Sequence, residues 1–103
     1  MLVEIRRYTI EPGRRDEFVA WFEREVMPAM EAEGMRILGM FVGVEDPDSF
    51  FYLRGFTSEE ERARQIEAFY DSAEWDHTLR PRAMEMEESF HVELVRSTEH
   101  SPI

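Results

Sequence analysis

The sequence contains no cysteine among its 103 residues. Disulfides, thiolate metal ligands and a cysteine nucleophile are therefore excluded. A chain without cysteine fits a reducing compartment. We expect a cytoplasmic protein.

Basic residues are scarce, and long hydrophobic runs are absent. Twelve arginines and no lysine stand against 23 aspartates and glutamates, which gives a formal charge of −11. Nucleic acids and anionic membrane surfaces attract basic proteins, so we expect neither as a partner. No run approaches the ~20 apolar residues of a membrane span. The first ten residues, MLVEIRRYTI, carry charges early and do not resemble a signal peptide.

Motifs for nucleotide binding and hydrolysis are also missing. The sequence has no P-loop, no dinucleotide fingerprint and no G-x-S-x-G elbow. His91 and Glu93 could both bind a metal, but a catalytic zinc needs three protein ligands and no third one is evident. We therefore expect no metal and no cofactor.

The hydrophobic pattern predicts strand, helix, strand, strand, helix, strand. The strands are expected near residues 3–9, 35–44, 49–56 and 89–95. A helix is expected over 14–34, with a kink at Pro28 and a stop at Gly34. A second begins after the capping serine Ser58, and a helical stretch interrupted at Pro81 follows it. We assign one domain to residues 1–96 and a polar tail to 97–103.

This order is typical of an α+β, ferredoxin-like βαββαβ fold with a four-stranded antiparallel sheet. Right-handed crossovers place both helices on one face of the sheet. The first strand then lies in the middle, between the third and the fourth.

Both faces of the central strands are apolar, although helices can cover only one. In FYLRGF, residues 51–56, apolar side chains point to both sides. An open face of this kind is larger than soluble monomers usually tolerate. We therefore predict a homodimer in which two sheets pack face to face around a shared interior.

Arg54 interrupts this apolar strand, and buried arginine needs a partner. If Gly39 and Gly55 let the helices approach closely, Arg54 points away from the helices into the dimer interior. Glu4, Arg6 and Tyr8 alternate along the first strand, and Tyr52 shares the face of Arg54. We predict that these five residues (Glu4, Arg6, Tyr8, Tyr52 and Arg54) bind a ligand or form a structural ion-pair network.

The last strand adds two candidate catalytic residues. Phe90, Val92 and Leu94 alternate with His91 and Glu93. With the apolar set against the helices, His91 and Glu93 join Arg54 in the predicted interior. A histidine beside a carboxylate can titrate near neutral pH and move a proton.

Four segments in order resemble the NIPSNAP family. They are VEIRRYTIEPGRRDEF, similar to V-E-L-R-x-Y-x-x-x-P-G, then GMRILGMF, DPDSFFYLRGF and AFYDSAEW, and the resemblance covers roughly Leu2 to Leu94. It implies the dimeric α/β-barrel superfamily. That superfamily includes cofactor-free monooxygenases of antibiotic biosynthesis, lactone isomerases and haem-binding enzymes.

Three functions stay open. The first is a homodimer that binds a small, partly apolar metabolite and transforms it by oxygenation, isomerisation or cyclisation without a cofactor. The second is a non-enzymatic interaction or sensing module with a filled interior. The third is a haem-binding protein, since some relatives in the superfamily use a histidine from a helix comparable to that of His77.

Overall fold

The computed structural model describes all residues, Met1–Ile103. Strand β1 (Leu2–Ile10) leads into one long helix made of α1 (Arg15–Trp21), the π-helical turn η1 (Phe22–Val26) and α2 (Met27–Ala32). Strands β2 (Arg36–Val42) and β3 (Ser49–Phe56) follow, then helix α3 (Glu59–Tyr70). The π-helical turn η2 (Trp75–Leu79), helix α4 (Arg80–Met86) and strand β4 (Glu87–Arg96) complete the chain.

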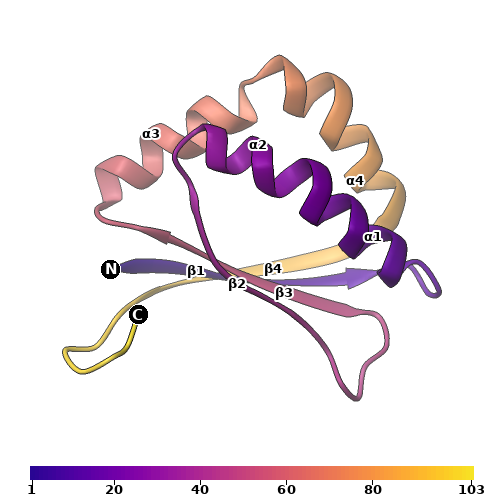
Figure 1. The fold of residues 1–103 in the computed structure, drawn as a ribbon, viewed down its shortest axis with the longest axis horizontal. Helices are drawn as coiled ribbons and strands as arrows, with labels where there is room; N and C mark the ends of the chain where they lie inside the picture. Colours follow the sequence, from indigo (N-terminus) through magenta and orange to yellow (C-terminus); the bar gives the residue numbers. More distant parts are fainter.

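The four strands form one antiparallel sheet in the order β2-β3-β1-β4. The helices arch over one face of this sheet, and the other face is not covered by any helix (Figure 1). The predicted α+β ferredoxin-like fold is therefore confirmed, including the central place of β1. None of the helices is long and apolar enough to cross a membrane.

Local signals in the sequence explain where the helices begin and end. The side chain of Ser58 caps α3 by accepting a hydrogen bond from the Glu61 N–H at 3.1 Å. Gly34 has a φ of +86° and ends the first long helix, as the sequence predicted. Pro28 does not divide this helix, because the turn just before it widens into η1. The turn η2 stands in the same way before Pro81. A proline lacks the N–H of the regular ladder, and a wider turn accommodates that loss.

The structure corrects the predicted direction of the two sheet faces. We call the face under the helices the helix face and the uncovered one the open face. Gly39 and Gly55 lie on the open face, not under the helices. A Cβ on Gly55 would meet the Leu38 and Met1 side chains at 2.9 Å, and one on Gly39 would meet the Phe41 ring at 2.8 Å. These glycines make room for apolar side chains of the open face, so they carry no information about helix approach.

A register shift in β2 interrupts the strict alternation of side chains between the two faces. Ile37 pairs with Arg54 and Gly39 with Leu53, so Leu38 is the extra residue. Ile37 and Met40 both pack against the core, although an odd and an even position should face opposite sides.

Candidate functional site

The five predicted binding residues come together on the helix face. Glu4, Arg6, Tyr8, Tyr52 and Arg54 are all buried and line one cavity between the sheet and the helices. Cross-strand pairing brings them together, because Glu4 lies opposite Arg54 and Arg6 opposite Tyr52. The sequence grouped these residues correctly. They face the helices, however, and not the opposite side of the sheet, where the dimer interior was predicted.

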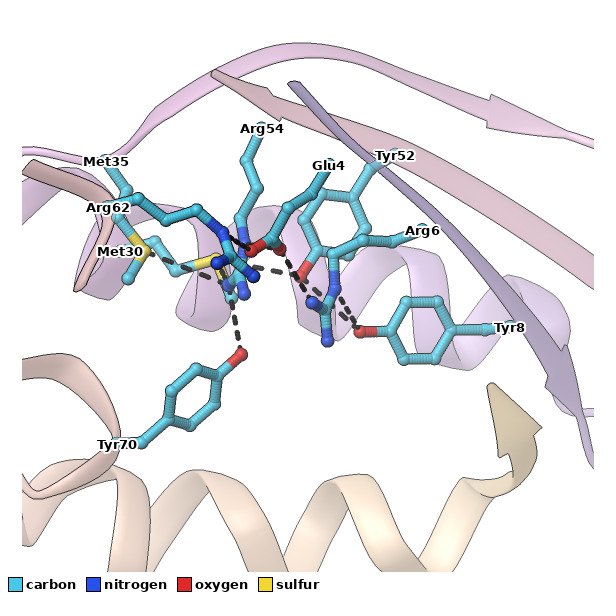
Figure 2. Close-up of polar contacts among 9 residues, drawn as sticks. All are labelled: Glu4, Arg6, Tyr8, Met30, Met35, Tyr52, Arg54, Arg62 and Tyr70. Atoms are coloured by element: carbon cyan, nitrogen blue, oxygen red, sulfur yellow. Dashed lines mark hydrogen bonds and ion pairs between the residues drawn. The ribbon is translucent and has the colours of Figure 1, made fainter. Parts of the chain in front are cut away.

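Glu4 is the centre of this polar cluster. Its Oε1 accepts hydrogen bonds from Arg6 Nη1 and from Arg54 Nε, both at 2.8 Å. Its Oε2 accepts one from Arg62 Nε on α3, also at 2.8 Å. Figure 2 shows the three guanidinium groups converging on the one carboxylate. One acidic side chain thus orients three basic ones that come from β1, β3 and α3.

Arg54 is fully buried, and its partners come from both the sheet and the helices. Besides Glu4, its Nη1 donates to the Tyr70 hydroxyl at 3.0 Å and lies 3.8 Å from the sulfurs of Met30 and Met35. Its guanidinium carbon is 5.5 Å from the centroid of the Tyr70 ring. Arg54, the charged residue within FYLRGF, therefore has its hydrogen-bond partners within the chain.

Arg6 is held among aromatic rings at the other end of the cluster. Its Nε donates a hydrogen bond to the Tyr8 hydroxyl at 3.0 Å. The Tyr8 hydroxyl in turn lies 3.5 Å from the hydroxyl of Tyr52. The guanidinium carbon of Arg6 lies 5.7 to 5.8 Å from the ring centroids of Tyr8, Tyr52 and Phe90. Such contacts stabilise a desolvated cation.

The protonation of the cluster follows from its charges and its burial. Burial by itself raises the pKa of Glu4, but the charges and hydrogen bonds of Arg54 and Arg6 outweigh it and hold that pKa below its usual value. Burial raises the pKa of Tyr8 and of Tyr52. At neutral pH Glu4 is therefore ionised, and both tyrosines keep a hydroxyl proton.

The cavity has a volume of about 460 Å³, within the range of small-molecule sites. Its walls are largely apolar and aromatic. The helix side contributes Phe18, Trp21, Phe22, Val26, Met30, Ile66, Tyr70, Trp75, Ala83 and Met84, and β4 contributes Phe90 and Val92. Both π-helical turns supply ring side chains to this wall, Phe22 from η1 and Trp75 from η2.

Four polar residues of the cavity were not among the predicted site residues: Arg62, Tyr70, Arg80 and Glu87. Arg62 and Tyr70 lie four residues before and after the apolar Ile66. Helical spacing places all three on one face of the helix and could have identified them. Glu87 lies where β4 begins, and its side chain lines the cavity without a hydrogen bond or ion pair within the chain. Burial raises the pKa of Glu87 to about 7, against a smaller lowering by the charge of Arg6. No motif marks it.

The predicted catalytic pair does not join this site. His91 pairs with Arg7 and Glu93 with Ile5, so both lie on the open face, and both are exposed. His91 and Glu93 point away from the helices, as predicted. The error was to place Tyr8 on that same face, because Tyr8 lies opposite Phe90 and paired residues share a face. Phe90 and Val92 line the cavity, as expected of the helix side.

The remaining histidine candidate is also remote from the cavity. The side chain of His77 is 77% exposed, and its Nδ1 lies 3.8 Å from an Asp76 carboxylate oxygen. It is not among the residues that line the cavity. No group of three or more acidic residues, histidines and cysteines is arranged to hold a metal ion. The geometry gives the haem hypothesis no axial ligand from His77 inside the cavity.

A comparison with known protein families shows which family the chain belongs to. The NIPSNAP family model matches residues 3–102. The chain belongs to the NIPSNAP family. No curated protein matches this NIPSNAP chain.

Solved structures share the NIPSNAP fold over the full length. An uncharacterized NIPSNAP domain protein from Burkholderia xenovorans superposes with a TM-score of 0.91 at 22% identity, with 100% of each chain covered. A NIPSNAP family protein from Agrobacterium tumefaciens gives 0.89 at 22% identity, covering 99% of this chain and 97% of that one. An antibiotic biosynthesis monooxygenase gives 0.68 at 20% identity, covering 95% and 99%. At these identities the likeness concerns the fold alone.

Proposed function

We propose that this NIPSNAP protein is a homodimer in which each chain binds a small, partly apolar metabolite between its sheet and its helices. The observation that carries the proposal is the cavity of about 460 Å³ with a buried Glu4–arginine cluster among aromatic walls. Buried charges are costly and gather at functional sites. An open cavity also argues against a filled interaction module.

The cluster suits chemistry on a ligand oxygen without a metal. Arginine side chains aimed into a low-dielectric cavity stabilise charge that develops on such an oxygen, as in an enolate. Glu87 adds a carboxyl group with a pKa of about 7, which can accept or return a proton near neutral pH. Oxygenation, isomerisation and cyclisation without a cofactor can all proceed through such an intermediate. The fold shared with an antibiotic biosynthesis monooxygenase is consistent with this reaction class.

The open face supports the dimer. Ile5 is 38% exposed and Phe41 is 53% exposed there, and half-buried Leu38, Phe51 and Leu53 lie on the same face. A contiguous apolar surface of this kind marks an interaction site. A second copy of the sheet would cover it, and each chain would keep its own cavity on the far side.

The two tryptophans of the chain provide a direct test of ligand binding. Trp21 and Trp75 are the only ones, and both line the cavity. A panel of aromatic acids, amides and alcohols is added to labelled protein while the two indole N–H signals are followed by NMR. We expect some members to shift both signals. If no compound moves either signal, the proposed function is wrong.

A matched pair of variants locates the binding. Val92→Trp places a large ring in the cavity, whereas Val42→Trp changes an exposed position outside it on the other edge strand. The first variant should weaken binding by about tenfold or more, and the second should leave it unchanged. Equal weakening by both variants would place the ligand elsewhere.

A further inference from the structure

The buried cluster has more positive than negative charge. Arg6, Arg54 and Arg62 surround the single carboxylate of Glu4 within hydrogen-bond distance. Glu87, the other carboxyl group of the cavity, forms no ion pair with any of them. Two positive charges are therefore not balanced within the cluster. Charges removed from water are stabilised by paired opposite charge.

The hydrogen-bond donors show which arginines have capacity left. Arg54 uses Nε for Glu4 and Nη1 for Tyr70, and its Nη2 makes no hydrogen bond within the chain. In Arg6, Nε donates to Tyr8 and Nη1 donates to Glu4, which leaves Nη2 without a hydrogen bond within the chain. In Arg62, Nε serves Glu4, and both terminal nitrogens are without a partner in the chain. Both side chains line the cavity.

The three arginine side chains differ in their exposure to solvent. The side chain of Arg54 is 1% exposed, whereas that of Arg62 is 32% exposed. Glu4 holds all three through one oxygen or the other, and each guanidinium group is a rigid planar fork. The free nitrogens of Arg6 and Arg62 are therefore pre-oriented donors, and Arg54 mainly supports the cluster.

The rest of the cavity determines what carries the negative group. Beside Arg6 the rings of Tyr8 and Tyr52 lie with centroids 5.7 Å apart and nearly parallel planes, and Phe90 stacks on the other side of Tyr8. Phe22 packs on Tyr52 at 4.7 Å. Flat aromatic groups pack well against such walls. An unbranched polar ligand would leave these walls without contacts.

We infer that the ligand is an apolar, aromatic molecule with one oxyanion, such as a carboxylate, that accepts hydrogen bonds from the free nitrogens of Arg6 and Arg62. This inference rests on the proposed function and specifies its ligand class. Charge-assisted hydrogen bonds from guanidinium groups to a carboxylate are among the strongest in proteins. The oxyanion would balance part of the positive charge that Glu4 leaves.

A pair of probes of nearly equal shape isolates the charge. Binding of 2-naphthoate and of its neutral counterpart 2-naphthamide is measured by titration calorimetry at about pH 6 and low salt. We expect the naphthoate to bind at least about tenfold more tightly. Equal or tighter binding of the amide overturns the inference and leaves the proposed function standing. If neither probe binds and no indole signal moves, both are wrong.

Variants of α3 assign the preference to Arg62. Arg62→Met removes the two free donors, and the Glu4 contacts with Arg6 and Arg54 remain to hold the fold. Arg64→Met is the control, since Arg64 is an exposed arginine on the same helix and does not line the cavity. The first variant should remove most of the preference for naphthoate without weakening naphthamide. An unchanged preference in Arg62→Met, or an equal loss in the Arg64→Met control, overturns the inference.

Discussion

The two faces of the sheet reverse the usual distribution of polar and apolar side chains. On the helix face, Glu4 and Arg54 are almost completely buried. On the open face, Ile5 and Phe41 are exposed although both are apolar. Burying charge and exposing apolar surface both cost free energy, and functional sites justify such costs. This contrast supports the proposal that one face carries a ligand site and the other an interface.

The largest expected effect comes from removing the central charge of the helix face. Glu4→Gln leaves three arginines without an anionic partner, and breaking a buried pair in this way costs about 3–5 kcal/mol of unfolding free energy. Urea unfolding at neutral pH measures the loss. The matched control Glu93→Gln changes an exposed glutamate on the open face and should cost less than about 0.5 kcal/mol. Similar losses in both variants would contradict the contrast between the faces.

The same residue predicts an acid-side pH dependence. The pKa of Glu4 is lower in the folded chain than its ordinary value of 4.5, so its contribution is complete above that value and is lost as the pH falls below it. Glu4→Gln should therefore flatten the decline of stability below about pH 4.5.

The next largest effect concerns the open face. Ile5→Lys places a charge at the centre of the proposed interface, opposite Glu93 and Leu53 of the same chain. Each dimer contains the change twice, and we expect the dimer dissociation constant to rise about a hundredfold, or about 3 kcal/mol. Sedimentation equilibrium measures it. Met84→Lys changes an apolar residue that is even more exposed and lies at the cavity, and it should leave the dimer intact.

Much of this contrast could be predicted from the sequence, because alternation with a period of two groups residues by face. It placed Glu4, Arg6 and Arg54 together, and β1 in the middle of the sheet. It could not determine which face the helices cover, since both faces of β3 are apolar. Gly55 does not mark a close helix, because its missing side chain makes room for Leu38 on the open face. His91 lies away from the helices, as predicted, and is apart from the cluster because Glu4 and Arg54 face the helices. Glu87 was missed because β4 begins two residues earlier than predicted.

A smaller effect is expected from Glu87. Its pKa is about 7 in the folded chain and 4.5 ordinarily, so the folded state binds more protons between these values. Its contribution therefore makes stability fall as the pH rises from about 4.5 to about 7. Glu87→Gln should be more stable than the parent by about 2 kcal/mol at pH ~8 and equal to it at pH ~4. The exposed neighbour Glu88 provides the control, and a similar gain in Glu88→Gln would contradict the assignment.

The smallest effect tests the link between the sheet and α3. Tyr70→Phe removes the hydroxyl that accepts from Arg54 Nη1 and keeps the ring beside the guanidinium group. A lost hydrogen bond to a charged group costs about 1–2 kcal/mol. Thermal unfolding of this variant measures the loss. Glu67→Gln, which changes an exposed residue of the same helix, is the control and should leave stability unchanged.

The number of ligands per dimer distinguishes a cavity within each chain from a site between the two sheets. Native mass spectrometry of the parent protein with 2-naphthoate counts the molecules bound to each species. We expect a dimer that carries two ligands and an Ile5→Lys monomer that still carries one, because each cavity is built by one chain. A dimer that carries a single ligand and loses it on dissociation would contradict the account and place the site between the two sheets.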